Sequence, residues 1–340
     1  MKTIDSADTR KRLADFVSEN GEWTAFNIHL GSEVYPINPD LTDERLRRIV
    51  QLLSDLAHKP LDQLRFADLA CAEGHYAIEA AMHGCESVGI EGRERNTAKA
   101  RFAQNILGLE RLTFVTDDLR NFSKENYGVF DVVLAAGILY HLDHPDVFQF
   151  LERIGDACED LLILDTYISL ACATSFTYKD HTYHGRYYRE HPKSATKEEQ
   201  ELQLWSSLDN PRSFWLTRAS LYNFLQEVGF TSVLEVHLPW VTDFRADRIT
   251  LVAVKGKRAH ALSSPVSDAL PIKPYPESTP TSVHPINDRR RRIVDLVRAL
   301  LPGPLRRALK AILIKTGVVK PPSVGVKAPW TWKEPWKKRY

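Results

Sequence analysis

Three acidic residues, Asp68, Glu91 and Asp118, each lie at the end of a short apolar run. The runs cover residues 65–70, 87–90 and 112–115. Runs of this length, bounded by turn-forming residues, are typical of strands buried in a parallel sheet. Because the carboxyl ends of parallel strands meet at one edge, we expect the three carboxylates to lie close together, at the edge where doubly wound sheets bind ligands.

The turn after the first of these strands is built from small residues. Ala70, Ala72 and Gly74 alternate along it, and a helix is predicted directly afterwards, over residues 75–83. Small side chains let the backbone turn sharply and let a ligand approach closely. We therefore predict that this turn, together with Asp68, lines a ligand-binding site.

The rest of the central region completes an alternating series of strands and helices. Further strands are predicted over residues 130–135, 161–164, 231–238 and 248–254, and further helices over residues 42–57, 145–158 and 218–228. The short link between the last two strands favours an antiparallel hairpin at one edge. The pattern predicts an α/β fold, a doubly wound and mostly parallel seven-stranded sheet with right-handed crossovers.

Two of the acids have chemistry that suits a nucleoside. The Glu91 carboxylate can accept hydrogen bonds from the two hydroxyls of a ribose. Asp118, with the free backbone groups at Leu119, can bind an adenine amino group and the edge of its ring. The alternative is that Glu91 or Asp118 caps the N-terminus of a helix.

The charge of the predicted edge limits the ligand further. A dinucleotide would need a helix N-terminus open to its pyrophosphate, usually with a third glycine where this chain has Ala77. No Lys or Arg lies between residues 69 and 92. The site therefore favours a ligand that is not anionic. S-adenosylmethionine fits, because its sulfonium and amino groups are positive and it carries no phosphate.

At these residues the chain resembles the class I S-adenosylmethionine-dependent methyltransferases. The resemblance covers residues 60–255 and includes the segment Phe130–Pro145, which is similar to the fourth-strand segment of that family. It implies a Rossmann-like methyltransferase fold with S-adenosylmethionine as cofactor. The first turn departs from the family pattern, since Ala70 and Ala72 stand where the family usually has glycines.

Two shorter segments resemble one branch of this family. Residues 139–141 (Leu-Tyr-His) and the segment Trp23–Gly31 are similar to the branch that contains the tRNA wobble-uridine carboxymethyltransferase. This resemblance implies, as an alternative, transfer of a methyl or carboxymethyl group to tRNA. The added carboxylate would need a cation, such as Arg186 or Arg212.

The segment after the fourth predicted strand supplies the candidate catalytic residues. Gly137 is expected to line the cofactor site, and Tyr140 and His141 to face the place where the methyl group meets its acceptor. His141 is the better candidate for a general base, because imidazole exchanges protons near neutral pH. The alternative is that His141 holds the backbone or orients the cofactor. No metal site is expected with Asp143 and His144, whose spacing lacks an i, i+4 pair.

An aromatic insertion at residues 170–216 is predicted to bind the acceptor. It contains more rings and hydrogen-bonding groups than a connection needs. The alternative is a packed Ω-loop whose aromatic side chains make a small satellite core. The residues expected to bind the acceptor are Tyr183, Arg186, Tyr187, Trp205, Arg212 and Trp215.

The net charge of +1 hides an asymmetry. From residue 284 to residue 340 there are 15 Lys or Arg and 3 Asp or Glu, a net charge of +12, so the preceding residues carry −11. A Ser/Pro-rich linker at residues 258–285 is expected to be extended and mobile. Residues 286–340 then show basic amphipathic helical patterns and interleaved tryptophans, which favour an anionic membrane surface. The alternatives are packing on the acidic catalytic region and binding of nucleic acid.

The chain thus divides into a predicted cap or lid over the sheet edge at residues 1–60, a methyltransferase domain at residues 61–257, the linker and the tail. We see no signal peptide or spanning helix and expect the catalytic part in the cytoplasm, with the tail on the inner face of a membrane. The four cysteines form no C-x-x-C pair and are expected to be reduced, without zinc.

The resemblance and the aromatic insertion together predict the reaction. We expect transfer of a methyl group from S-adenosylmethionine to an oxygen or nitrogen of a hydroxylated small-molecule or glycan-type acceptor. The alternatives are the tRNA reaction and a catalytically silent scaffold that only binds the cofactor.

Overall fold

The computed structural model of the chain describes residues 6–24, 28–31, 34–36, 44–192, 194–236, 246–256 and 274–277. The chain divides into two compact units, Met1–Thr279 and Pro280–Tyr340. Every described residue belongs to the first unit, so the predictions for the basic tail lie outside the described residues. None of the described helices is long and apolar enough to cross a membrane.

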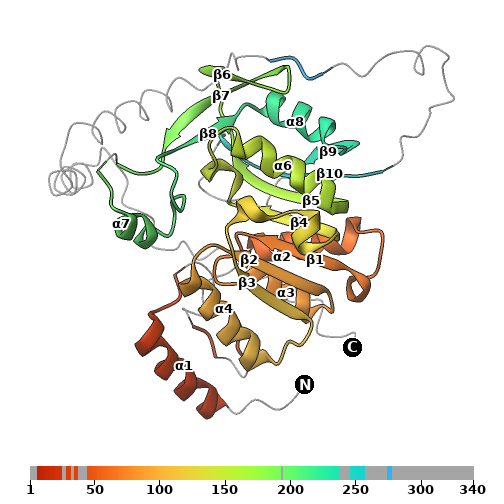
Figure 1. The fold of residues 1–340 in the computed structure, drawn as a ribbon. Coiled ribbons are helices and arrows are strands. Elements are labelled where there is room, and N and C mark those ends of the chain that lie inside the picture. Colours follow the sequence, from red (N-terminus) through yellow and green to blue (C-terminus); the bar gives the residue numbers. More distant parts are fainter. Residues whose placement is uncertain are drawn as a thin grey trace, which may run out of the picture. The chain divides into compact units, whose positions relative to one another are not determined.

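Seven strands form the central sheet, in the order β3-β2-β1-β4-β5-β10-β9 (Figure 1). They are β1 Arg65–Leu69, β2 Glu86–Glu91, β3 Leu112–Thr116, β4 Phe130–Ala136, β5 Cys158–Tyr167, β9 Ser232–Glu235 and β10 Arg248–Val254. β10 runs antiparallel to β5 and β9, and the other pairs are parallel. The predicted seven-stranded sheet is confirmed. Because the strand order reverses between β1 and β4, the ligand-binding edge lies at their carboxyl ends.

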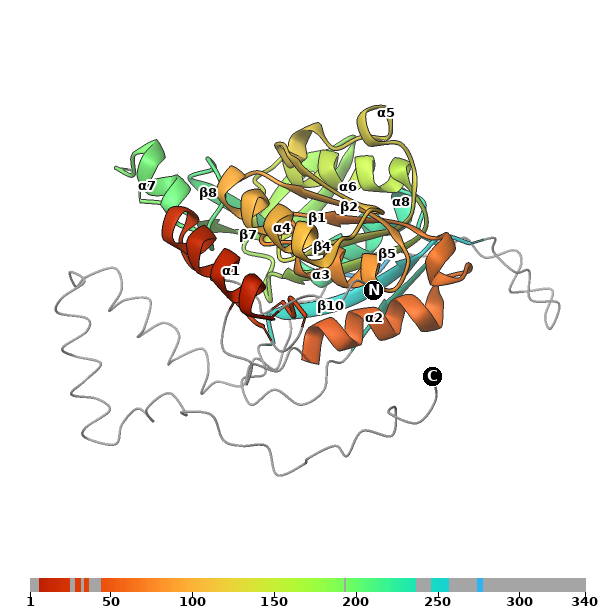
Figure 2. The ribbon, with the colours of Figure 1, turned by 90° about the horizontal axis from the view of Figure 1, so that it is seen from below.

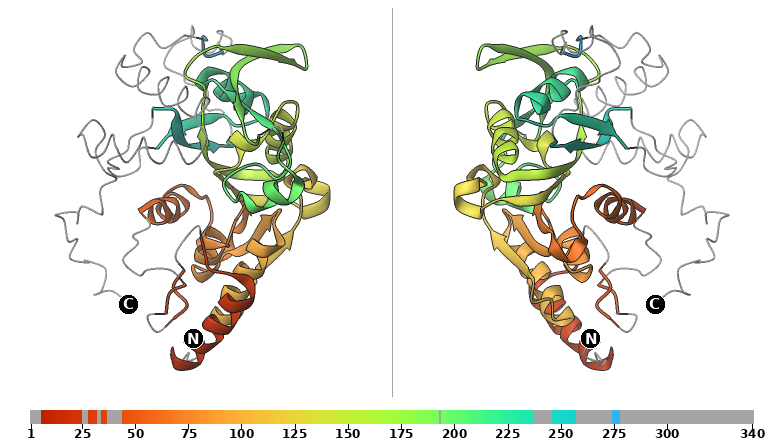
Figure 3. Two further views of the ribbon diagram at one scale, coloured as in Figure 1. Left: turned by 90° about the vertical axis from the view of Figure 1, so that its left-hand side faces the viewer. Right: turned by 90° about the vertical axis from the view of Figure 1, so that its right-hand side faces the viewer.

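Helices cover both faces of this sheet, as Figures 2 and 3 show. On one face lie α2 Glu44–Leu56, α3 His75–Met82 and α4 Glu94–Leu107. On the other face lie α6 Asp146–Ala157 and α8 Arg218–Glu227. Two short connections are η1 Leu61–Gln63 and α5 Lys124–Tyr127. In β1, Phe66 packs with α2 and α3, whereas Ala67 belongs to the core with α6 and α8. Burial on both faces explains the uninterrupted apolar runs of these strands.

The N-terminal segment packs beside the sheet more than over its edge. Helix α1, Ser6–Asn20, which the sequence did not predict, lies along α4, where Phe16 stacks on Phe102 with ring centroids 4.4 Å apart. The backbone N–H of Thr24 donates to Glu73, whose carboxylate forms a fully buried ion pair with Lys99 at 2.9 Å. Among the described N-terminal residues, this short segment reaches the turn after β1, whereas α1 lies along α4 and α2 packs on one face of the sheet.

The aromatic insertion is a three-stranded antiparallel sheet with one helix. It consists of β6 Thr174–Tyr178, β7 His181–Arg189 and β8 Arg212–Leu216, with α7 Lys197–Leu202 between β7 and β8. On one face, Tyr183 of β7 packs against Phe148 of α6 and Phe224 of α8. This face belongs to the main hydrophobic core, in one cluster with residues of β1, β4 and β5, so the Ω-loop with a separate satellite core is not observed. The even-numbered residues of β7 point to the opposite face.

Part of the predicted mobile linker is bound to the catalytic unit. The carboxylate of Glu277 accepts a hydrogen bond from Ser220 in the first turn of α8, where the helix dipole favours a negative charge. The side chain of Asn223 donates to the carbonyl of Tyr275 at 3.1 Å and accepts from its N–H at 2.7 Å. The expectation of an extended and mobile linker is therefore wrong for residues 274–277.

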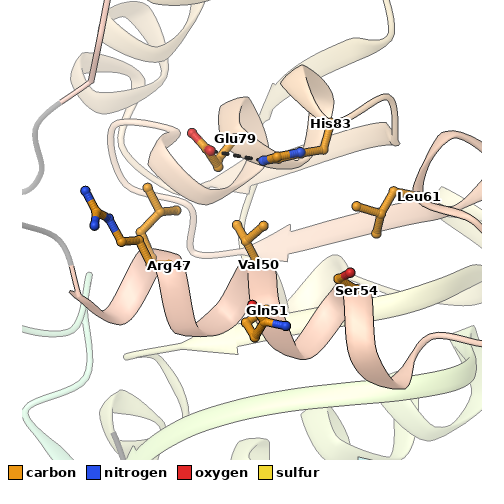
Figure 4. A pocket seen from close by; sticks show the side chains of 8 residues that line it. Arg47, Val50, Gln51, Ser54, Leu61, Glu79 and His83 are labelled. Atoms are coloured by element: carbon orange, nitrogen blue, oxygen red, sulfur yellow. Dashed lines mark hydrogen bonds and ion pairs between the residues drawn. The ribbon is translucent and has the colours of Figure 1, made fainter. Parts of the chain in front are cut away.

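A shallow groove lies between α2 and α3 (Figure 4). His83, at the end of α3, pairs with Glu79 at 3.2 Å on one wall, and Val50 of α2 faces them. The lining residues are Leu46, Arg47, Val50, Gln51, Ser54, Leu61, Glu79 and His83. The carboxyl edge of the sheet meets the N-terminus of α3, whereas the groove lies along the later residues of α3. The groove is therefore separate from the predicted site.

Candidate active site

The turn after β1 contains three residues with a left-handed backbone. The angle φ is +59° at Ala70, +49° at Ala72 and +85° at Gly74. Gly74 is the N-cap of α3, and a Cβ atom there would lie 2.5 Å from the ring of Phe114, so only glycine fits. The two alanines adopt the backbone that glycine adopts without strain, at a cost of roughly 1 kcal/mol each.

Asp68 lies buried beneath this turn and is 1% exposed. One carboxylate oxygen accepts a hydrogen bond from the N–H of Ala77, in the first turn of α3, at 3.1 Å. Burial raises the pKa of Asp68 to about 7, the hydrogen bond from Ala77 opposes this rise, and the nearby charge of Glu91 adds to it. A positive charge bound nearby would favour the ionised form of Asp68.

Glu91 is the last residue of β2 and is buried. Its carboxylate accepts hydrogen bonds from the N–H groups of Arg93 at 3.0 Å and Ala72 at 3.1 Å, and from the side chain of Asn96 at 3.2 Å. Burial raises the pKa of Glu91, and these hydrogen bonds offset the rise in part. Glu91 therefore holds the turn in place, and its oxygens still have lone pairs for a ribose hydroxyl.

Asp118 follows β3 and caps η2, the 3-10 turn Leu119–Asn121. Its carboxylate accepts from the backbone N–H of Arg120 at 2.9 Å and from the guanidinium at 2.5 Å. Burial alone would raise the pKa of Asp118, but the hydrogen bonds and charge of Arg120 outweigh it, and the pKa lies below its usual value. The capping role is thus observed. The side chain of Leu119 is buried in the core, and the adenine contact of these two residues stays a prediction.

Two arginines connect the ends of β2 and β3 to the insertion. The guanidinium of Arg93 donates to three backbone carbonyls between residues 201 and 206, at 3.1–3.3 Å. Arg120 forms an ion pair with Asp209 at 2.6 Å. The segment that follows α7 is therefore fixed against the predicted cofactor edge.

The residues after β4 form the centre of the site. The N–H of Gly137, where φ is +90°, donates to the carbonyl of Asp165 at 2.9 Å. A short 3-10 helix, η3 Leu139–His141, then carries Tyr140 and His141. Burial raises the pKa of Tyr140 to about 12, so its phenol stays protonated at neutral pH. Nδ1 of His141 lies 2.8 Å from the carboxylate of Glu190, which directly follows β7.

The face of the small sheet that carries the even-numbered residues of β7 meets η3. Trp215 donates from its indole N–H to the carbonyl of Tyr140 at 2.9 Å, and Tyr167 stacks on Trp215 at 5.0 Å. Arg186 lies 4.2 Å from the ring centroid of Trp215, and Tyr188 stacks on that ring at 4.7 Å. We call these five residues the aromatic face.

The other residues predicted to bind the acceptor lie elsewhere. Tyr183 is 3% exposed and serves the core between the small sheet and α6, which corrects its assignment. Arg212 lies over Tyr187 at 4.2 Å and pairs with Asp143 at 2.8 Å, on the face opposite Trp215. Trp205 is 67% exposed in the segment after α7. Of the six residues, Trp215 contacts Tyr140 and is 4% exposed, and Arg186 lies over the Trp215 ring.

Several residues of the site were missed by the sequence analysis. Glu190 is 49 residues from His141, and no local pattern connects the two. Tyr167 ends β5, so the rule that strand ends line the ligand-binding edge could have found it. Arg248 begins β10 and lies over Tyr167 at 5.2 Å, and Tyr188 is recognisable only once β7 is known to be a strand.

The geometry fits the predicted cofactor. The turn at residues 70–74 allows close approach, and two buried carboxylates, Asp68 and Glu91, lie beside it. Carboxylates suit a ligand with hydroxyl donors and positive groups, whereas a pyrophosphate would meet repulsion. Fold and site define an S-adenosylmethionine-dependent methyltransferase with a class I fold.

Comparison with known families agrees. The Methyltransf_23 family model, described as a methyltransferase domain, matches residues 41–235, which is more than half of the chain. The chain belongs to this methyltransferase family, and S-adenosylmethionine is its cofactor. A search of curated protein sequences found no significant match.

One solved structure supports the fold assignment, and two others match with lower TM-scores. The N-terminal domain of EvdMO1, crystallised in the presence of SAH and D-fucose, matches with a TM-score of 0.56 and 21% identity, over 76% of this chain and 100% of that one. Magnesium protoporphyrin IX methyltransferase (ChlM) from Synechocystis PCC 6803 matches with a TM-score of 0.42 and 15% identity, over 73% of this chain and 100% of that one. A putative O-methyltransferase from Nostoc punctiforme PCC 73102 matches with a TM-score of 0.44 and 18% identity, over 75% and 70%.

Proposed function

We propose that this enzyme methylates a hydroxylated small molecule or glycan-type acceptor that binds on the aromatic face. The observation that carries this proposal is the contact of Trp215 with Tyr140, which joins the aromatic face to the residues after β4. An aromatic ring can stack on the apolar side of a sugar ring, and guanidinium groups such as that of Arg186 can donate to its hydroxyls. The crystals of the EvdMO1 domain that contained D-fucose are consistent with an acceptor of this class.

The protein's part in the reaction is chiefly alignment and exclusion of water. When bound, the cofactor supplies a methyl group on a positively charged sulfur. Asp68 and Glu91 provide negative charge at the turn after β1, and Gly137 leaves room for close approach after β4. Tyr140, which is protonated and largely buried, can donate a hydrogen bond beside the acceptor.

Calorimetry with S-adenosylmethionine, S-adenosylhomocysteine and carboxy-S-adenosylmethionine, followed by transfer assays with a methyl-labelled cofactor, tests the proposal. The acceptor panel contains deoxyhexoses, other monosaccharides, oligosaccharides, hydroxylated aromatic compounds and unmodified tRNA. We expect binding of the ordinary cofactor and labelling of a hydroxylated small molecule or glycan. Tyr188→Leu should raise the KM for that acceptor and leave the affinity for S-adenosylmethionine within about twofold, because the ring of Tyr188 is 44% exposed where it stacks on the buried Trp215. Trp205→Leu, in the exposed segment after α7, is the matched control.

The alternatives give different results. Preference for carboxy-S-adenosylmethionine with labelling of tRNA would replace the proposal by the wobble-uridine reaction. Cofactor binding without transfer to any acceptor class would favour the silent scaffold.

A further inference from the structure

Glu190 is a buried carboxylate that three donors hold in one orientation. Its side chain is 1% exposed. It accepts from Nδ1 of His141 at 2.8 Å, from the hydroxyl of Ser213 at 2.7 Å and from the backbone N–H of Ser207 at 3.1 Å. These partners come from η3, from β8 and from the segment before β8, so the contact joins three parts of the site.

The surroundings keep Glu190 ionised. Burial would raise its pKa, but the hydrogen bond and charge of His141, with the hydrogen bonds from Ser213 and Ser207, outweigh burial, and the pKa of Glu190 lies below its usual value. A buried carboxylate without such partners would be costly, since removal of a charge from water costs several kcal/mol. The group is therefore held as an anion next to the imidazole.

An anionic carboxylate can only accept a hydrogen bond, so Nδ1 of His141 must carry the proton. In the neutral ring the lone pair is then on Nε2. The side chain of His141 is 13% exposed. Among the described residues, the hydrogen bond of its ring is the one from Nδ1 to Glu190. A carboxylate that fixes the tautomer of a histidine is the arrangement of a general base with an orienting group.

The charges on the aromatic face bear on which acceptor needs such a base. A hydroxyl and a protonated amine both have to lose a proton during methyl transfer. Arg186 lies over Trp215 at 4.2 Å and pairs with the buried Asp247 at 3.7 Å. Arg248 lies over Tyr167 at 5.2 Å and pairs with the buried Asp165 at 2.6 Å, so each guanidinium group here is compensated by a carboxylate. Because the arginines are paired, the positive sulfur of the cofactor is the charge that repels an ammonium group at the reacting position. A neutral hydroxyl has no such penalty.

We propose that Glu190 is a positioning residue that makes Nε2 of His141 the general base, and that the acceptor atom is a hydroxyl oxygen. This inference rests on the proposed function and names the atom that reacts. The oxygen forms a bond to the methyl carbon, and the carbon–sulfur bond breaks with its electron pair left on sulfur. The hydroxyl proton goes to Nε2 and from there to solvent.

The tautomer can be measured without knowing the acceptor. We would label the histidines with ¹⁵N, bind S-adenosylhomocysteine at pH 8 and assign the ring of His141 by its loss in His141→Ala. The expected spectrum has a protonated Nδ1 and an unprotonated Nε2. In Glu190→Gln the preference of His141 for the tautomer protonated on Nδ1 should weaken or reverse, because an amide can both donate and accept a hydrogen bond. Glu152→Gln is the control. It removes a carboxylate of α6 that pairs with Lys179, between β6 and β7, and it should leave the His141 signal unchanged.

A proton on Nε2 in the unsubstituted protein would overturn the inference, whatever the variants do. This result would leave the proposed function intact, since methyl transfer to a hydroxylated acceptor needs no particular tautomer. Conversely, the proposed function would be wrong if none of the hydroxylated acceptors were methylated. The tautomer measurement would still show whether Glu190 orients His141.

The acceptor identified by the labelling panel gives a second test. Glu190→Gln should lower kcat about tenfold to a hundredfold, and His141→Ala about a hundredfold or more, with cofactor affinity within about twofold. A structural role of Glu190 would instead weaken cofactor binding and stability together. An unchanged kcat in both variants, or transfer to an amine in preference to a hydroxyl, would contradict the inference.

Discussion

Individual residues in the turn after β1 carry unequal strain. Ala70 and Ala72 occupy left-handed backbone with room for their side chains, whereas Gly74 is enclosed by Phe114 and Ala100. The first two positions therefore cost conformational strain only, while the third forbids any side chain. A turn that looks uniform in sequence thus has one obligatory glycine and two tolerated alanines.

This difference predicts unequal effects of exchanging glycine and alanine at the two positions. Gly74→Ala should lower the free energy of unfolding by roughly 3 kcal/mol or more, because the new methyl group would lie 2.5 Å from Phe114 in a backbone unsuited to alanine. Ala72→Gly should change it by less than about 1 kcal/mol, since relief of strain opposes the greater entropy of the unfolded chain. Urea denaturation measures both. Equal destabilisation would show that steric crowding does not distinguish the two positions.

Asp68 predicts a pH-dependent stability. Its pKa is raised to about 7 when folded, from an ordinary value of 3.8, so the unfolded state releases this proton at lower pH than the folded state. Its contribution to stability is therefore greatest below about pH 4 and falls as pH rises to about 7. Asp68→Asn should remove this dependence and raise the free energy of unfolding by roughly 1–3 kcal/mol above pH 7.

Denaturation curves at pH 4, 6 and 8 without cofactor measure this effect. Asp62→Asn, at an exposed carboxylate in η1, is the control. If Asp68→Asn raised the free energy of unfolding by the same amount at all three pH values, the carboxylate would be ionised throughout this range. That result would contradict the pKa expected from its burial.

At the scale of elements, the predictions succeeded where the pattern is local. Buried parallel strands are continuous apolar runs, so β1 to β5 were recognisable, and the predicted strand at residues 248–254 is β10. The small sheet was missed because its strands contain Thr, Tyr, His and Arg rather than aliphatic residues, although Thr and Tyr are common in strands. Helix α1 was also missed, and its Phe16 packs on Trp23 and on Phe102 of α4. The contact of His141 with Glu190 is long-range, and no period in the sequence encodes it.

The link between α7 and the cofactor edge predicts a local change in dynamics. Arg93→Ala removes three hydrogen bonds to backbone carbonyls between residues 201 and 206. We expect amide exchange in residues 197–206 to become about tenfold faster or more, since loss of about 1.4 kcal/mol of local stability has this effect. Hydrogen–deuterium exchange read by mass spectrometry is the measurement.

The control for this experiment is Arg12→Ala, which removes an exposed ion pair with Asp8 on α1. It should leave exchange in residues 197–206 unchanged. Unchanged exchange in the Arg93 variant as well would show that packing, and not these hydrogen bonds, holds the segment.

At the scale of the whole molecule, the chain separates into an acidic unit and a basic one. Residues 284–340 carry a net charge of +12, and the unit boundary after Thr279 leaves the contacts of Glu277 with α8 in the catalytic unit. A truncated chain should therefore end at Thr279. Ending it at Lys257 would also remove the carboxylate at the N-terminus of α8.

We predict that the full-length chain floats with vesicles of acidic lipids and that the chain ending at Thr279 does not. Each Lys or Arg near an anionic surface contributes about 1 kcal/mol. Both forms should bind S-adenosylmethionine with affinities within about twofold. If the two chains float equally poorly, the tail has another role. Competition between vesicles and RNA then separates a membrane surface from nucleic acid.

The alternation along β7 has a consequence for how such an enzyme can diverge. On one side Tyr183 is buried in the core and the partly exposed Tyr187 contacts Phe214, and on the other Arg186 and Tyr188 belong to the aromatic face. With the acceptor on the aromatic face, as we propose, mutations at the second pair would alter acceptor preference while Tyr183 keeps the sheet in place. A new specificity could evolve by single substitutions, whereas one inserted residue would exchange the two sides and lose both.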